Sequence, residues 1–394
     1  MSVIDRFAAG VEGRFPARPM AVARIGAAAA ILLELRNSAE TLLRLAEPGV
    51  IRAAWFGPVV PVTEPIAWLV IGVWLAANIG LLLGFRTRLS GALLTVMLAF
   101  TLLADQQLYS NHLYLMTVVA ALLSIGDSGA ALSLDARRGG ARTDLPAWPV
   151  LLLRLQISVV YGYAALSKLN PDFLSGSVVA SYLRRDGPLA LPADWRSVEP
   201  MLVLSVLAIC MEAFLAVALW LPRWRHVAFP VALALHVGIA IWLTPTYALS
   251  VFSLFMLPML VLFLDPAPGR LTLVWDDGCG FCGAWVRWFR RLDWLDAIRP
   301  VPRSGLAASG LPVAAEAAAR ALQAVEGDRV RGGFAAVTAV AEALPLTFLW
   351  APLLRLPPVA WIGERWYARV AARRSCELPG PALTTRGATP AGRG

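Results

Sequence analysis

The segment that decides the fold is PMLVLSVLAICMEAFLAVALWL, residues 200–221. It is long enough to cross a lipid bilayer as a helix, because about 20 apolar residues span the hydrocarbon core. Glu212 is its only charged residue. Of the 394 residues in the chain, 58% are hydrophobic and only 15% are charged, and the mean hydropathy is +0.65. Soluble domains rarely have such a composition, so the sequence predicts a polytopic membrane protein.

Apolar runs predict an all-α membrane domain of about eight helices over residues 1–265. The runs lie at residues 21–45, 66–83, 89–104, 112–126, 149–168, 200–221, 226–243 and 247–264. The first run contains Arg36, Glu40 and Arg44, which repeat every four residues and so share one helix face. We expect that face to point into the bundle or a water-filled cavity, because charged side chains are costly in lipid.

Arginines in the connections predict the orientation in the membrane. They gather before the first run and between runs two and three, four and five, and six and seven. Since Lys and Arg accumulate in short cytoplasmic loops, both termini are expected in the cytoplasm and the protein in the cell membrane. The net charge of +9 follows this loop pattern and not a basic surface with interleaved aromatics, so we expect no nucleic-acid partner.

A small α/β domain is predicted over residues 270–380, after the Pro/Gly linker DPAPGR. Residues 271–276 and 297–302 have strand patterns, 321–333 has a hairpin pattern, and helices are expected at 283–294, 312–322, 334–345 and 359–374. The tail at residues 381–394 is rich in Gly, Pro and Thr and is predicted to be disordered.

Two cysteines of the second domain follow its first strand directly, in the sequence WDDGCGFCGAW. Cys279 is placed at a helix N-terminus, where unpaired N–H groups and the helix dipole stabilise a thiolate, and Cys282 follows one turn later. A zinc half-site and inert structural thiols are the alternatives. Zinc needs two further ligands, and this domain offers only Cys376 and no histidine, so we assign no metal.

Three segments resemble the DCC family of thiol-disulfide oxidoreductases, whose motif is Asp-x-x-Cys-x-x-Cys. They are WDDGCGFCGAWVRWFRRLD, VEGDRVRGGFAAV and WYARVAARR. The motif falls on Asp276, Cys279 and Cys282, and Asp277 stands before Gly278 as in the common form of such sequences. The resemblance implies a thioredoxin-like fold and dithiol exchange with a disulfide or dithiol partner, either a protein or a small thiol.

Ionisable residues within the apolar runs are site candidates, because lipid tolerates them only when they are paired or solvated. Glu212 and His236 lie twelve residues to either side of Trp224, at the centre of a short turn. At 1.5 Å per residue both lie roughly 18 Å deep, so they are expected to meet as a hydrogen-bonded pair. This pair either handles protons or clamps two helices together.

His112 and Lys168 are predicted to lie at the outer face, at the ends of two apolar runs. A lysine at a helix end often only extends its amine to the membrane interface. Here Tyr161 precedes Lys168 by two turns, which weakens that interpretation.

The segments NHLYL and KLNPDFLSG resemble the HTTM family, the membrane domain shared with vitamin K-dependent γ-glutamyl carboxylase, over residues 15–265. The matching residues are Asn111, His112, Tyr114, Leu115, Lys168, Leu169, Asp172 and Gly176. The resemblance implies that Lys168 is the base that deprotonates a hydroquinone, with His112 as its partner.

These features favour a membrane-bound thiol-disulfide oxidoreductase whose membrane domain handles a quinone or another lipid-soluble partner. The first alternative is a carboxylase-like modifying enzyme that uses Lys168 as its base. The second is a non-enzymatic membrane protein of export, immunity or interaction. Replacing Lys168 and replacing Cys279 distinguish the three hypotheses.

Overall fold

The computed structural model describes residues 11–53, 55, 61–184, 190, 192, 194, 198–243, 247–264 and 268–373. The chain forms two compact units, Met1–Asp265 and Pro266–Gly394, each of which is described by itself. Cys376 and the tail predicted at residues 381–394 lie outside the described residues.

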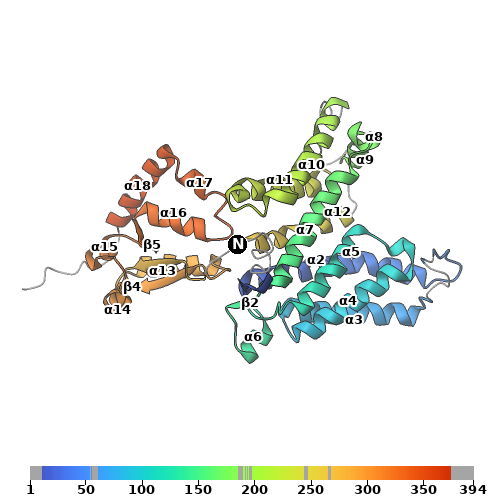
Figure 1. Cartoon of the computed structure of the whole chain (residues 1–394), viewed down its shortest axis with the longest axis horizontal. Helices are drawn as coiled ribbons and strands as arrows, with labels where there is room; N and C mark the ends of the chain where they lie inside the picture. Colours follow the sequence, from blue (N-terminus) through green and yellow to red (C-terminus); the bar gives the residue numbers. More distant parts are fainter. Residues whose placement is uncertain are drawn as a thin grey trace, which may run out of the picture. The chain divides into compact units, whose positions relative to one another are not determined.

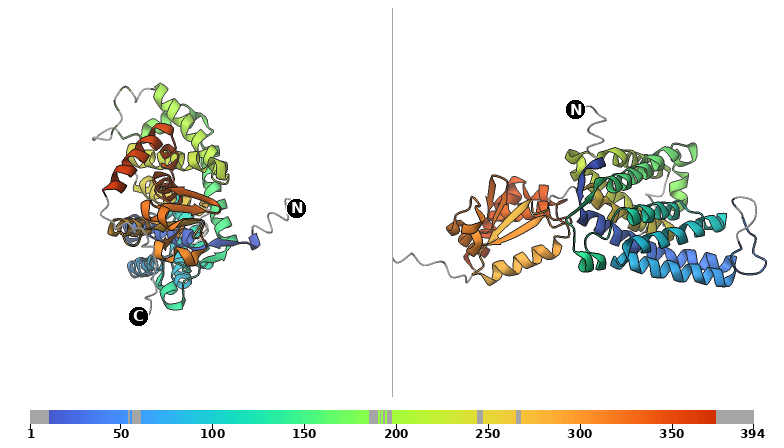
Figure 2. Two further views of the ribbon diagram at one scale, coloured as in Figure 1. Left: turned by 90° about the vertical axis from the view of Figure 1, so that its left-hand side faces the viewer. Right: turned by 60° about the horizontal axis from the view of Figure 1, so that its bottom comes forward.

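Within its described residues the first unit contains eight helices of 13 or more residues (Figures 1 and 2). They are α2 (Ala17–Leu45), α3 (Glu64–Leu83), α4 (Thr87–Ala104), α5 (Asn111–Ile125), α7 (Ala147–Ser167), α10 (Val198–Ala218), α11 (Arg225–Trp242) and α12 (Tyr247–Met259). Each overlaps one of the predicted apolar runs, so the helical membrane domain is confirmed.

Five of the helical segments are long and apolar enough to cross a membrane. They are Glu64–Leu83, Thr87–Ala104, Ala147–Ser167, Glu199–Ala218 and Pro222–Trp242. Two further apolar segments, Asn111–Ile125 and Leu249–Phe263, are shorter. The chain is therefore an integral membrane protein.

Helix α2 packs against α3, α5 and α12, and in Figure 1 it lies side by side with its two neighbours α3 and α5. Many of its buried residues are alanines, whose small side chains let neighbouring backbones approach closely. At Gly26 an added Cβ would lie only 2.2 Å from Cβ of Pro258 in α12. The α2–α12 contact therefore depends on a residue without a side chain.

The charged face of α2 does not point into the bundle, so the prediction of burial within the bundle is wrong. Arg36, Glu40 and Arg44 are exposed, and Arg36 forms an exposed ion pair with Glu40 at 3.7 Å. With 29 residues the helix is about 43 Å long at 1.5 Å per residue, whereas the hydrocarbon core is about 30 Å thick. Its last turns therefore extend further than a span requires, and their charges need no burial.

The second unit contains a four-stranded mixed sheet in the order β4-β3-β5-β6. Its strands are β3 (Leu271–Trp275), β4 (Ile298–Pro302), β5 (Gln323–Glu326) and β6 (Arg329–Gly332). Strand β3 runs parallel to β4 and antiparallel to β5, and β5 and β6 form the predicted hairpin. The small α/β fold predicted from the sequence is confirmed.

Helices cover both faces of this sheet, because alternate strand residues point to opposite sides. Leu271 and Leu273 share a core cluster with residues of α13 (Gly280–Leu292) and α16 (Phe334–Ala343). Val274 lies in the opposite cluster, with residues of α14 (Leu306–Ser309) and α15 (Ala315–Arg320). After α16 the chain forms α17 (Ala351–Leu354) and α18 (Pro357–Ala372), and α18 packs on α16.

Candidate functional site

The two cysteines of the second unit lie where β3 gives way to α13. Cys279 is the residue immediately before the helix, and Cys282 lies in the first turn. Both side chains are buried, with exposed fractions of 2% and 8%. The N–H of Cys279 donates to the carbonyl of Asp276 at 3.2 Å, and the carbonyl of Cys279 accepts from Gly283 at 3.1 Å. The predicted placement of Cys279 at a helix N-terminus is confirmed.

The two acids of the motif fasten this loop to the end of the neighbouring strand. The buried carboxylate of Asp276 forms an ion pair with Arg303 at 3.2 Å and accepts from the N–H of Gly278 at 3.3 Å. The carboxylate of Asp277 accepts from the N–H of Ser304 at 3.2 Å. Hydrogen bonding to Ser304 holds the pKa of Asp277 below its ordinary value. The loop before the Cys-x-x-Cys pair is thus held at two points.

Arg303 was not singled out from the sequence, although a topological signal was present. Strands β3 and β4 are parallel neighbours, so their carboxyl ends lie at the same edge of the sheet. Residues that follow β4 therefore lie beside residues that follow β3. The sequence predicts both strands, but it does not predict the contact between the residues that follow them.

In the membrane unit Lys168 pairs with Glu212. Lys168 is the residue that follows the last turn of α7 as its C-cap. Its Nζ atom donates to both carboxylate oxygens of Glu212, at 2.8 and 2.7 Å. It also donates to the carbonyl of Ala164 at 3.2 Å. The side chains are 25% and 9% exposed. An amine and a carboxylate in this contact can share and exchange a proton.

The predicted pair of Glu212 and His236 is wrong, since each residue has another partner. Nε2 of His236 lies 2.8 Å from the hydroxyl oxygen of Tyr161, and Nδ1 lies 3.4 Å from Oγ of Ser253 in α12. All three side chains are buried. Equal depth in the membrane did not ensure contact, because the rotation of each helix about its axis decides which neighbour a side chain meets.

His112 lies in a third polar cluster, with α2. Its Nε2 is 3.1 Å from the carboxylate of Glu34 and 3.3 Å from the hydroxyl of Ser110, and Ser38 also donates to Glu34 at 3.0 Å. Glu34 is buried, although the sequence did not single it out as a site residue. The neighbouring Asn111 is exposed and accepts from the hydroxyl of Tyr109 at 3.0 Å.

His112 and Lys168 were expected to act as partners, but the structure pairs each with a different carboxylate. His112 lies within hydrogen-bonding distance of Glu34, and Lys168 forms an ion pair with Glu212. In place of one His–Lys site, the described part of the membrane unit therefore has the Lys168–Glu212 ion pair and, separately, the contact of His112 with Glu34.

The comparison with protein families identifies both units. The HTTM domain model matches residues 15–267. This chain belongs to the HTTM family. The model of the DCC1-like thiol-disulfide oxidoreductase matches residues 273–376, so an HTTM unit is followed by a DCC1-like unit with a Cys-x-x-Cys pair. No solved structure matches the chain.

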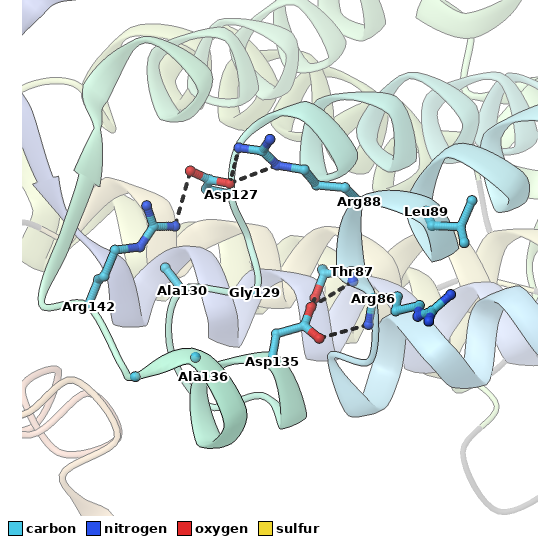
Figure 3. Close-up of a pocket in the computed structure, with 12 residues that line it drawn as sticks. Arg86, Thr87, Arg88, Leu89, Asp127, Gly129, Ala130, Asp135, Ala136 and Arg142 are labelled. Carbon is cyan, nitrogen blue, oxygen red and sulfur yellow. Dashed lines mark hydrogen bonds and ion pairs between the residues drawn. The ribbon is translucent and has the colours of Figure 1, made fainter.

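The HTTM unit also has a pocket of about 480 Å³ between the start of α4 and the segment at residues 126–142 (Figure 3). Arg88 and Arg142 line it, and both form ion pairs with Asp127. Partial burial alone would raise the pKa of Asp127, but hydrogen bonds from the two arginines outweigh burial and hold that pKa below its ordinary value. Asp127 thus engages both of these arginines and joins the start of α4 to the segment at residues 126–142.

Asp135 completes this junction at the N-terminus of α4. Its carboxylate accepts from the backbone N–H groups of Arg86 at 2.8 Å and Thr87 at 2.7 Å, as Figure 3 shows. These N–H groups have no partner within the helix, so an acid from another segment satisfies them. The hydrogen bonds outweigh partial burial and hold the pKa of Asp135 below its ordinary value.

Proposed function

We propose that this protein is a membrane-bound thiol-disulfide oxidoreductase in which Cys279 is the attacking thiolate and Cys282 the resolving cysteine. The observation that carries the proposal is the position of Cys279 immediately before α13, with Cys282 in the first turn. Membership of the second unit in a thiol-disulfide oxidoreductase family supports the same chemistry.

The reaction transfers two electrons to a disulfide. The Cys279 thiolate attacks one sulfur of the substrate disulfide, forms a mixed disulfide and releases the other sulfur as a thiolate, which takes up a proton. The deprotonated Cys282 then attacks the Cys279 sulfur and releases the second substrate thiol. The dithiol leaves this cycle as a Cys279–Cys282 disulfide, and a reductant must return it to the dithiol.

The Asp276–Arg303 pair fits a positioning role in this cycle. It holds the side chain of Asp276, the first residue of the motif, while the N–H of Cys279 donates to the Asp276 carbonyl. In the predicted orientation the dithiol lies in the reducing cytoplasm, where a lasting structural disulfide is unfavourable and a transient catalytic one is expected.

A second candidate function rests on the Lys168–Glu212 pair in the HTTM unit. With its proton moved to Glu212, the neutral Lys168 amine can accept a proton from the hydroxyl of a quinol-like substrate, which leaves as an oxyanion. The contact of Nζ with both carboxylate oxygens favours this exchange. A carboxylase-like enzyme and a quinone-linked oxidoreductase both need such a base. The predicted topology places Lys168 across a core of about 30 Å from the dithiol, so coupling requires a mobile quinol or a conformational step.

Three variants of the full-length protein in lipid nanodiscs test these assignments. Cys279→Ser should abolish reduction of a model disulfide, whereas Cys210→Ser, at an exposed cysteine of α10, should leave it unchanged. Lys168→Ala should spare this reaction and abolish any quinol-dependent turnover. A Cys279→Ser protein that still reduces the disulfide rejects the oxidoreductase. If all three variants keep the biological function of the protein, the function is not enzymatic at either site.

Orientation needs a separate test because it decides the compartment of the dithiol. A reporter fused after Gly394 that is active only in the cytoplasm is the expected result. Activity only outside the cytoplasm would reverse the proposed topology and move the dithiol to the opposite compartment.

A further inference from the structure

Helix α13 carries an exposed aromatic ridge that begins inside the dithiol motif. Phe281, Trp285 and Trp288 are 45%, 40% and 46% exposed. Their rings contact one another in sequence, with centroids 6.2 Å apart for the first two and 5.4 Å apart for the two tryptophans. We call these three residues the aromatic ridge. A continuous apolar surface of this kind on a folded domain marks an interaction site.

The ridge is distinct from the face of α13 that supports the fold. The buried residues Cys282, Val286 and Phe289 follow the ridge residues by one position each. At about 100° per residue their stripe is rotated by roughly a quarter turn from the ridge. The core of the second unit therefore holds one face of α13, and the ridge lies on the neighbouring face, where the rings of Trp285 and Trp288 also contact the ring of the buried Phe289.

Arginines border the ridge on its other flank. Arg287 and Arg291 are exposed and lie roughly a quarter turn from the ridge, on the side away from the buried stripe. Tryptophan at the centre with arginine along the edge is typical of helices that lie in a membrane interface, where the rings sit among headgroups and the cations reach the phosphates.

The bilayer is also within reach of this helix. Leu264 ends the last described segment of the membrane unit and Leu271 begins β3. The seven residues from one to the other span at most about 25 Å when fully extended. Charge complementarity and this short tether both favour a lipid surface as the partner of the ridge.

We propose that the aromatic ridge of α13 docks on the surface of an anionic phospholipid bilayer, with Arg287 and Arg291 bonded to lipid phosphates. Because Phe281 lies between the two cysteines, docking places the N-terminal end of α13 at the lipid boundary. A lipid-soluble two-electron reductant then meets the Cys279–Cys282 disulfide without leaving the membrane and, giving up two electrons and two protons, returns it to the dithiol. This last consequence rests on the proposed redox function, whereas docking itself does not.

The exposed tryptophan of α18 provides a matched control. Trp361 is exposed like the ridge residues, but the guanidinium carbon of Arg365 lies 3.8 Å from its ring centroid and Glu364 is also exposed beside it. A cation therefore already covers the Trp361 ring, so this position should contact lipid less than Trp288 does.

The test uses the full chain in nanodiscs of mixed zwitterionic and anionic phospholipid, with the photo-crosslinker p-benzoylphenylalanine in place of Trp288 or of Trp361. Lipid adducts, counted by mass spectrometry, should be several-fold more abundant at position 288. Arg287→Glu combined with Arg291→Glu should lower the yield at 288 several-fold. Equal yields at the two positions, crosslinks at 288 only to residues 11–264 of the chain itself, or a yield unaffected by the two charge reversals would overturn the proposal.

The dithiol serves to separate this proposal from the redox function. Cys279→Ser combined with Cys282→Ser should leave the lipid adducts at position 288 unchanged while it abolishes disulfide reduction. If the protein reduces the disulfide at the wild-type rate but shows no preference for lipid adducts at position 288, docking is rejected and the redox function is retained. Preferential adducts without any disulfide reduction would retain docking and reject the redox function.

Discussion

The Lys168–Glu212 pair predicts an asymmetric response to the loss of either partner. The perturbation is a double-mutant cycle with Lys168→Met, Glu212→Leu and the combined variant. Each substitution removes a charge and keeps an apolar side chain of similar length, so packing changes little. The cycle isolates the interaction between the two charges.

The expected losses of unfolding free energy follow from how far the side chains of Lys168 and Glu212 are exposed to solvent. Two charges about 4 Å apart gain about 4 kcal/mol at the effective dielectric constant of a partly buried site, and the cost of removing both from water offsets most of this gain. Lys168→Met leaves the Glu212 carboxylate, 9% exposed, without its cation and should cost about 3 kcal/mol of unfolding free energy. Glu212→Leu should cost only about 1 kcal/mol, because the Lys168 ammonium is 25% exposed and can extend into water.

The assay is reversible unfolding of the full-length protein in mixed micelles, followed by tryptophan fluorescence as the denaturing detergent increases. The combined variant should lie within about 1 kcal/mol of wild type, because two apolar groups replace a desolvated pair. Costs that simply add in the combined variant would show that the two side chains do not interact. A larger cost for Glu212→Leu than for Lys168→Met would refute the exposure argument.

Three further substitutions probe packing, capping and the dithiol loop. Gly26→Ala should destabilise the HTTM unit by about 2 kcal/mol in the same assay because its Cβ would collide with Pro258, whereas Gly72→Ala, with no atom within 4 Å of the added Cβ, should not. Asp135→Ala should cost about 1 kcal/mol at neutral pH through the lost helix cap. Since the pKa of Asp135 is depressed in the folded protein, the stabilisation by this cap is present above the unfolded pKa of about 3.9 and is lost as the pH falls through the folded pKa. A difference in unfolding free energy between Asp135→Ala and wild type that persists in acid would contradict this. Asp276→Ala should speed amide hydrogen exchange at residues 276–279 about tenfold, as expected for the loss of one charged hydrogen bond, and unchanged exchange would show that the buried acid does not hold the loop.

Local patterns in the sequence were sufficient for the eight long helices of the membrane unit and for the four strands of the second unit. Apolar runs located all eight long helices, and in the five segments long enough to span, the bilayer imposes a minimum length of apolar residues. Alternation and turn residues located the β5–β6 hairpin, whose Gly327 has a positive φ of 57°, as a tight turn requires. Cys279 at the start of α13 followed from the strand before it and the amphipathic helix after it.

The partners of the polar residues could not be predicted from the same patterns. Spacing from a turn gives the depth of Glu212 and His236, but their contacts depend on helix rotation and on which helices are neighbours. Glu34 joins His112 across 78 residues of sequence, and no local pattern encodes that distance. The charges on α2 are exposed and not buried because they lie in the last turns of a helix of 29 residues, which is longer than a span requires.

The most direct test of the central claim is a redox titration of the full-length protein in nanodiscs, in which thiol alkylation at each cysteine is read by mass spectrometry. Cys279 and Cys282 should lose reactivity together as a single two-electron couple, with the reduced-to-oxidised ratio changing tenfold for about every 30 mV. Cys210 should not take part in that transition. Independent titration of the two cysteines, or thiols that stay alkylatable at every potential, would contradict it.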